Sequence, residues 1–157
     1  MSIYDPATYD FSTAVPPMLG RVRTAMLDAL DERLAPLDLK TADYIVLAIL
    51  ANGGSATAST VCSFLAHDPG AMTRKIDVLE SRGLVRRVRS DQDRRAIKLE
   101  LTSEGKKLYP KALAIGVGVA NDFLRGFSKA EVKTLESMLK RIHENSEVPA
   151  TVEGKSP

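Results

Sequence analysis

The chain has 157 residues, of which 44% are apolar and 27% are charged, with a net charge of +2. This composition is typical of one globular domain, alone or with a helical extension. No stretch approaches the roughly 20 apolar residues that span a bilayer, and the N-terminus lacks the features of a secretion signal. The single cysteine, Cys62, excludes an intramolecular disulfide and favours a reducing compartment. We therefore expect a cytoplasmic protein with no membrane partner.

The first dozen residues lack a helical period, which predicts an irregular arm. Ser12 or Thr13 is a suitable N-cap for the helix that follows, because a hydroxyl accepts a hydrogen bond from the first turn. Apolar residues then recur at spacings of three and four up to about Ala35. Pro36 is expected to end this helix because proline has no N–H for a helix interior.

A second helix is predicted from Thr41 to the Asn-Gly-Gly sequence at residues 52–54. Its middle is almost wholly apolar, which predicts burial on most sides. Asp43 falls in its first turn, where the helix dipole favours an anion. Ser55 or Thr57 is expected to begin a short third helix.

A fourth helix follows, with Asp68 as N-cap, Pro69 at its first position and Gly83 as a left-handed residue after its end. Residues 85–89 and 97–101 predict two strands, the second with one buried face because apolar and charged residues alternate. The polar residues 90–95 join the strands. This order of helix, turn, helix and hairpin is typical of a winged helix-turn-helix.

Two further helices are predicted after the hairpin. Thr102 is a suitable N-cap for a long fifth helix, in which Gly116 and Gly118 permit close approach of another backbone. Ser128 and Glu131 form a capping box for a sixth helix. The segment 146–157 is rich in Pro, Gly, Ser and charge, which predicts disorder.

Positive charge is concentrated in residues 74–98, which contain nine Lys or Arg and four Asp or Glu. This local balance of +5 leaves −3 for the rest of the chain. A basic segment on an otherwise near-neutral body suits a polyanion. Because the segment covers the fourth helix and the hairpin, we expect it to bind double-stranded DNA.

The second helix of a helix-turn-helix lies in the major groove with its N-terminal residues at the base edges. Arg74 is the main candidate for a base contact, because its guanidinium can form two hydrogen bonds with guanine. Gly70, Ala71 and Thr73 are candidates for thymine methyls or phosphates, and Lys75 is a candidate for phosphate. The alternative is that Arg74 and Lys75 are ordinary solvated charges.

The hairpin loop supplies further candidates. An arginine at a wing tip can enter a minor groove and respond to its width and negative potential, and we assign that role to Arg94. Arg95 is a second DNA-binding candidate. Asp93 is expected to pair with Arg95 and stiffen the wing. A plain charged turn is the alternative, since an exposed ion pair contributes only about 0–1 kcal/mol.

The stretch MTRKIDVLESRGLVRRVRSDQDRRAIKLELTSEGKKL resembles the MarR (multiple antibiotic resistance regulator) family of winged-helix transcription factors. The segment LDLKTADYIVLAIL at residues 37–50 also resembles that family's second helix, and the resemblance spans about residues 15–145. The shared pattern consists of Thr73-Arg74, Leu79-Glu80, Gly83-Leu84, Asp93-Arg94-Arg95, Leu101-Thr102 and Gly105.

The resemblance implies a homodimer built by the terminal helices, with two winged lobes in successive major grooves of a pseudo-palindrome. It also implies inhibition by small phenolic or other aromatic effectors. Apolar surface on the first, fifth and sixth helices agrees with dimerisation, with a monomeric helical cap as the alternative. Ligand-binding candidates, which combine apolar walls with one cation, are Met18, Arg21, Tyr44 and Phe64.

The sequence thus predicts a mainly α fold with a small β-hairpin wing (α+β), a winged helix-turn-helix with terminal dimerisation helices. We divide it into an N-terminal arm and dimerisation helix (1–36), a DNA-binding lobe (37–102), C-terminal dimerisation helices (103–145) and a tail (146–157). The predicted function is transcriptional regulation, most simply repression by a ligand-responsive homodimer on double-stranded DNA.

Two other functions are compatible with parts of the sequence. Cys62 suggests a thiol-based redox sensor, although a buried, inert cysteine is the simpler interpretation. A winged helix that binds a protein partner is a second alternative, which the basic segment disfavours. His67 and His143 lack further ligands at metal-binding spacing, and no nucleophile or acid–base cluster stands out, so we expect no metal, no cofactor and no enzymatic activity.

Overall fold

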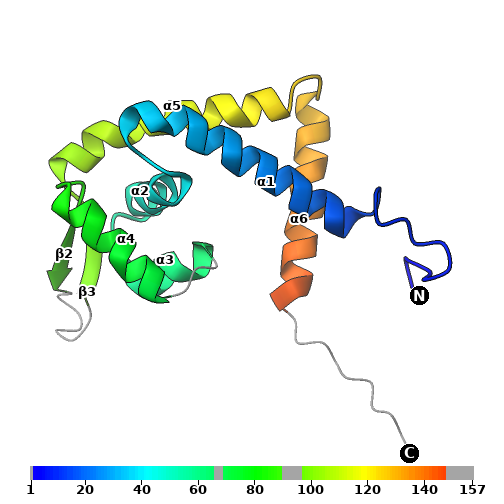
Figure 1. Ribbon diagram of the computed structural model, residues 1–157, viewed down its shortest axis with the longest axis horizontal. Coiled ribbons are helices and arrows are strands. Elements are labelled where there is room, and N and C mark those ends of the chain that lie inside the picture. Colours follow the sequence, from blue (N-terminus) through cyan, green and yellow to red (C-terminus); the bar gives the residue numbers. More distant parts are fainter. Residues whose placement is uncertain (1, 66–68, 90–96, 148–157) are drawn as a thin grey trace, which may run out of the picture. The chain divides into compact units, whose positions relative to one another are not determined.

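The computed structural model describes residues 2–65, 69–89 and 97–147 (Figure 1). Contacts divide the chain into two compact units, Met1–Ala120 and Asn121–Pro157, and each is described by itself. The elements are α1 (Val15–Leu34), the 3₁₀ turn η1 (Ala35–Leu37), α2 (Thr41–Gly53), β1 (Ala56–Thr57), α3 (Ala58–Leu65), α4 (Pro69–Ser81), β2 (Val85–Arg89), β3 (Ile97–Leu101), α5 (Ser103–Phe123) and α6 (Lys129–Glu147).

The sheet is three-stranded and antiparallel in the order β1-β3-β2. β2 pairs with β3 from Val85 opposite Leu101 to Arg89 opposite Ile97, which confirms the predicted hairpin strands. β1 pairs with the other edge of β3 and was not predicted, because two residues are too few to show an alternating pattern. The prediction of a mainly helical winged fold is confirmed.

The predicted N-cap of α1 is wrong. The cap is Ala14, which makes no side-chain hydrogen bond, and the Ser12 and Thr13 hydroxyls instead donate to the Asp10 carboxylate at 2.7 and 2.8 Å. A capping side chain accepts from the second or third helical N–H. These positions are Pro16 and Pro17, which have no N–H to donate.

The ends of the helix-turn-helix follow the local signals. The Thr57 hydroxyl accepts the Thr60 N–H at 3.2 Å, so Thr57 caps α3. After α4, Gly83 has a φ of 68°, and the Leu84 N–H donates to the Leu79 carbonyl at 3.0 Å. This is the glycine-dependent helix ending that the sequence predicts.

The core of the first unit is built around α2, which lies between α5 on one side and α4 on the other (Figure 1). Nearly solvent-free side chains come from helices and sheet alike, which makes this a single continuous core. Its largest members are Leu34, Leu39, Leu47, Leu50, Met72, Ile76, Leu79 and Leu99.

Two glycines of α5 allow this helix to pack closely against the rest of the unit. A Cβ on Gly105 would lie 2.1 Å from the Leu84 carbonyl oxygen, so only glycine fits there. A Cβ on Gly116 would lie 2.6 Å from the Tyr44 hydroxyl. Within this unit the space beside Gly116 is filled by the Tyr44 ring, and close approach of another backbone at Gly116 and Gly118 stays a prediction.

The second unit is dominated by α6. The Ser128 N–H donates to Glu131 Oε2 at 2.7 Å and the Glu131 N–H donates to Ser128 Oγ at 3.3 Å, which confirms the capping box. α6 extends to Glu147, two residues into the segment that we predicted to be disordered, and residues 148–157 lie outside the described part. No residue of α6 is buried.

Candidate nucleic-acid interface

The two sides of α4 differ in character. Met72, Ile76 and Leu79 are buried in the core. Arg74 and its neighbour Thr73 lie on the outer side of the helix and are exposed. Arg74 forms no ion pair with another described residue. Because helical residues recur every 3.6 positions, burying one stripe of α4 directs Arg74 outward. The guanidinium is therefore available to a DNA base.

The other predicted contacts in this helix vary in exposure. Gly70 and Thr73 are exposed, and Ala71 is half-buried. Asp68, the predicted N-cap, lies outside the described residues, as do the wing-tip candidates Asp93, Arg94 and Arg95. Their DNA-binding roles stay predictions.

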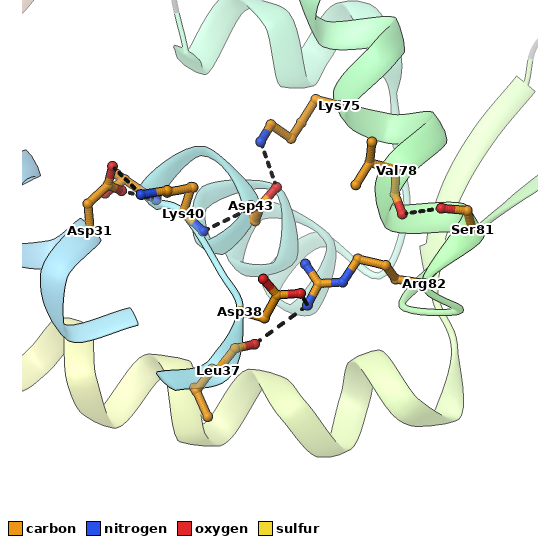
Figure 2. Close-up of polar contacts among 10 residues, drawn as sticks. Asp31, Leu37, Asp38, Lys40, Asp43, Lys75, Val78, Ser81 and Arg82 are labelled. Carbon is orange, nitrogen blue, oxygen red and sulfur yellow. Dashed lines mark hydrogen bonds and ion pairs between the residues drawn. The ribbon is translucent and has the colours of Figure 1, made fainter. Parts of the chain in front are cut away.

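Lys75 lies on the inner flank of α4, as Figure 2 shows. Its ammonium is 3.0 Å from Asp43 Oδ1, and the Asp43 side chain is only 5% exposed, against 29% for Lys75. The other carboxylate oxygen, Oδ2, accepts the Lys40 N–H at 2.8 Å, which places Asp43 as a cap of α2. This orientation differs from the one that the predicted phosphate contact requires, because the ammonium is turned toward a buried anion.

A second cation on this flank is Arg82, two turns after Lys75. Its guanidinium lies 3.2 Å from Asp38 Oδ2 and 3.5 Å from the Leu37 carbonyl (Figure 2). The Asp38 side chain is 93% exposed, so water screens this pair and its contribution is only about 0–1 kcal/mol.

The opposite flank of α4 is tied to the sheet. Arg87 on β2 lies 2.6 Å from Asp77 and also pairs with Glu80, one turn further along α4. On the other face of the hairpin, Arg86 pairs with Glu100, which is directly opposite in the strand register, at 2.8 Å. Helix α4 is thus held by ion pairs on both flanks.

These ion pairs neutralise part of the positive charge in residues 74–98. Four of the seven described cations in residues 74–98 are paired with carboxylates, and Asp38, Asp43 and Glu100 come from outside that segment. Among the described residues, the cations of the segment without an ion pair are Arg74 on α4, Arg89 on β2 and Lys98 on β3. Arg89 and Lys98 were missed as individual sites, because the sequence does not show which neighbouring cations are neutralised.

The three ligand candidates with described side chains, Met18, Arg21 and Tyr44, do not line one common hollow. Arg21 donates to the Ser12 carbonyl and lies 3.7 Å from the Met18 sulfur, so it ties the N-terminal arm to α1. Arg21 also lines a hollow of about 550 Å³ beside α1, which has neither Met18 nor Tyr44 in its lining. The Phe64 side chain is outside the described part.

Tyr44 has a different environment. It is half-buried against Gly116 of α5, and burial, with a smaller effect of Tyr109, raises the pKa of its phenol. A second hollow of about 580 Å³ runs along α2 toward α3, and among the described side chains its lining includes none of Met18, Arg21 and Tyr44. A ligand-binding role for these residues therefore stays a prediction.

The one cysteine of the chain lies in α3. Cys62 is half-buried and packs against the core. Within residues 2–65, 69–89 and 97–147, no three His, Cys, Asp or Glu side chains gather as metal ligands. None of the described helices is both long and apolar enough to cross a membrane.

The chain is similar to known proteins over most of its length. A family model described as MarR family matches residues 37–96. The multiple antibiotic resistance protein MarR of Escherichia coli is 30% identical over 114 residues, which cover 72% of this chain and 79% of that protein.

Solved structures are also similar to this chain. A mutant MarR from E. coli complexed with operator DNA has a TM-score of 0.72 at 28% identity, over 86% of this chain and 99% of that one. CouR from Rhodococcus jostii RHA1, bound to p-coumaroyl-CoA, has a TM-score of 0.79 at 26% identity, over 86% and 95% of the two chains. The winged helix-turn-helix, the outward Arg74 and these likenesses together identify the chain as a DNA-binding transcriptional regulator of the MarR family.

Proposed function

We propose that this regulator is a ligand-responsive repressor that acts in the cytoplasm as a homodimer on a pseudo-palindromic operator. The observation that carries the DNA-binding part is the exposed Arg74 on a helix whose other flanks are fastened by ion pairs. A guanidinium that projects from a helix held in this way can form two hydrogen bonds with guanine in the major groove. Arg89 and Lys98 on the adjacent strands would contact phosphates and so set the register.

Exposed apolar side chains support the homodimer. They occur along α1, α5 and α6, the helices that we assign to dimerisation, and not on the winged lobe alone. The set is Val15, Met18, Leu19, Val22, Leu113, Val117, Phe123, Leu135, Met138, Leu139 and Ile142. Exposed apolar side chains on each of these helices favour association, and a two-fold dimer would place the two copies of α4 about 34–36 Å apart.

The effector is proposed to be a small aromatic or phenolic compound, in line with the p-coumaroyl group bound by the similar CouR. Such a ligand lowers operator affinity only if it binds the dimer with unsuitable helix spacing more tightly than the DNA-bound form. A half-buried Cys62 beside the core gives the alternative of a thiol sensor little support.

The test begins with selection of operator sites from random duplexes by the purified protein. We expect a pseudo-palindrome, bound with an affinity that falls steeply with salt. Arg74→Ala should cost about 1–3 kcal/mol and relax the preference at one base pair of each half-site. An Arg74→Ala variant that weakens all sequences equally would instead indicate a phosphate contact. Failure to bind any duplex at low salt would exclude the proposal.

To test the effector, the operator titration is repeated with p-coumaroyl-CoA and a panel of aromatic acids. A ligand-responsive repressor should lose operator affinity with at least one of them, while its affinity for random duplex stays the same. A transcription assay with the selected operator then separates repression from activation.

A further inference from the structure

We infer that Lys75 is not a DNA contact but a positioning residue, which sets operator specificity by anchoring the recognition helix α4 to the buried carboxylate of Asp43. This inference rests on the proposed function, since it assigns a role within the same DNA interface. It concerns the residue immediately after the proposed base contact, Arg74.

The anchor is buried and geometrically defined. Oδ1 of Asp43 has almost no solvent access and makes no hydrogen bond within the described residues, so the Lys75 ammonium at 3.0 Å is the group that compensates its charge. Removing one partner of a buried pair leaves an uncompensated charge, which is far more costly than losing an exposed pair. The carboxylate therefore strongly favours the α4 placement in which Lys75 reaches it.

The carboxylate is itself held in place. Its other oxygen accepts the Lys40 N–H at 2.8 Å, and the neighbouring Thr41 N–H donates to Asp31 Oδ1 of α1 at 2.6 Å. The Thr41 hydroxyl donates to the Leu27 carbonyl, also on α1, at 3.3 Å. The start of α2 is thus fixed to α1, and Asp43 is a rigid reference point for α4.

The helix geometry transmits this restraint to the base contact. Lys75 and Arg74 are neighbours on α4, so about 100° of helical rotation separates their directions. A rotation or slide of α4 that breaks the Lys75–Asp43 pair also moves the Arg74 guanidinium. Bidentate recognition requires correct placement within a fraction of an ångström, so the specific contact should be lost before the non-specific one.

The experiment measures affinity for the selected operator and for a random duplex with the full-length protein and three variants: Lys75→Gln, Asp43→Asn and the double variant. The matched control is Lys107→Gln, which removes the same charge from a Lys107–Glu104 pair of 2.8 Å on the exposed side of α5. Thermal unfolding is recorded for each protein, so that affinity is measured where the protein is folded.

Anchoring predicts that Lys75→Gln and Asp43→Asn each weaken operator binding about tenfold, within the range of coupling between contacting residues. Affinity for random duplex should change less than about twofold, because phosphate contacts dominate it. The double variant should recover most of the operator affinity, since the two amides can hydrogen-bond and no buried charge remains. Lys107→Gln should behave as wild type.

A phosphate contact predicts the opposite pattern. Lys75→Gln would then weaken binding to both duplexes alike. It would also reduce the slope of log affinity against log salt concentration by about one unit. Asp43→Asn would leave binding unchanged or tighten it, because it releases the ammonium. This pattern, or wild-type affinity in both single variants, overturns the inference.

Asp43→Asn also keeps the test decisive if Lys75→Gln does not fold, because the freed Lys75 ammonium can reach water. A wild-type protein that prefers no operator would overturn the proposed function, and this inference with it. A wild-type protein that prefers its operator while Asp43→Asn has no effect overturns the inference alone.

Discussion

The first unit, residues 1–120 (here called the body), buries apolar side chains in a core, whereas helix α6 exposes them. In the body, apolar side chains of α2, α4 and β3 close against one another, and Leu47, Ile76 and Leu99 are almost free of solvent. In α6, Leu135, Leu139 and Ile142 recur with the same helical spacing and are exposed. An amphipathic helix without a covered apolar face has little tertiary stabilisation. The body is thus stabilised internally, whereas the apolar face of α6 is suited to association.

The largest expected effect is in the body. Leu47→Ala removes a fully buried side chain from α2 and should lower the free energy of unfolding by about 2–5 kcal/mol. Urea unfolding at fixed protein concentration measures this loss. Leu139→Ala in α6 is the matched control; at a protein concentration too low for dimerisation, it should change the free energy of unfolding of residues 1–120 by less than about 1 kcal/mol. Equal losses in the two variants would contradict the comparison.

A smaller effect distinguishes two glycines of the same helix. Gly105→Ala forces a methyl group against the Leu84 carbonyl and should destabilise the protein by about 1–3 kcal/mol. Gly118→Ala meets only the Arg33 side chain, at 3.9 Å, and should stabilise α5 by up to about 1 kcal/mol. Thermal unfolding of both variants checks the difference. A neutral Gly105→Ala would show that this end of α5 is not pressed against the body.

The apolar face of α6 is tested through association. Leu139→Lys places a charge on that face and should raise the dissociation constant of the proposed dimer tenfold or more, equivalent to about 1.4 kcal/mol. Sedimentation over a range of concentrations gives this constant. Lys140→Ala, at the adjacent exposed position, should leave it within about twofold. Identical dimerisation of Leu139→Lys and wild type would exclude this face from the interface.

The smallest expected effect is at the junction of α1 and α2. Burial alone would raise the pKa of Asp31, but the hydrogen bonds from Thr41 and the charges of Lys40 and Lys75 outweigh it, so its pKa lies below the ordinary 3.8. A depressed pKa contributes stability above 3.8, and this contribution is lost as the pH falls through the lower folded value.

Asp31→Asn should therefore be less stable than wild type at pH 7, by less than about 1 kcal/mol because the carboxylate is partly exposed. The difference should shrink as the pH falls below 3.8. Urea unfolding at pH 7 and pH 3 measures it. A difference that grows on acidification would contradict the assigned role of the carboxylate.

Local chemistry made most element boundaries predictable. Thr57, Gly83 and Thr102 each act through hydrogen bonds to residues within a few positions, and the β2–β3 strands follow a pattern that can be recognised in five residues. The cap of α1 shows the limit of this reasoning. Ser12 and Thr13 had the right chemistry, but their hydroxyls bond to Asp10 and the helix begins only at Val15, where Pro16 and Pro17 leave a cap no donor to accept from.

The candidate site also has one part that the sequence predicted and one part that it did not. The outward direction of Arg74 followed from the spacing of Met72, Ile76 and Leu79, which is a property of one helix. The partner of Lys75 is 32 positions away in the chain, at the start of a different helix, and no local pattern identifies it. Counting charges in residues 74–98 therefore overstated the number of cations that have no ion-pair partner among the described residues.

By itself, the sequence determined the order of the helices, the wing strands, the family pattern and the outward side of the recognition helix, because these depend on interactions between near neighbours. The tertiary structure alone decided that Lys75 turns inward, that Tyr44 fills the space at Gly116 and that Gly105 meets Leu84. Each of these contacts joins segments that are distant in the chain, and such contacts are set by how the helices pack around α2.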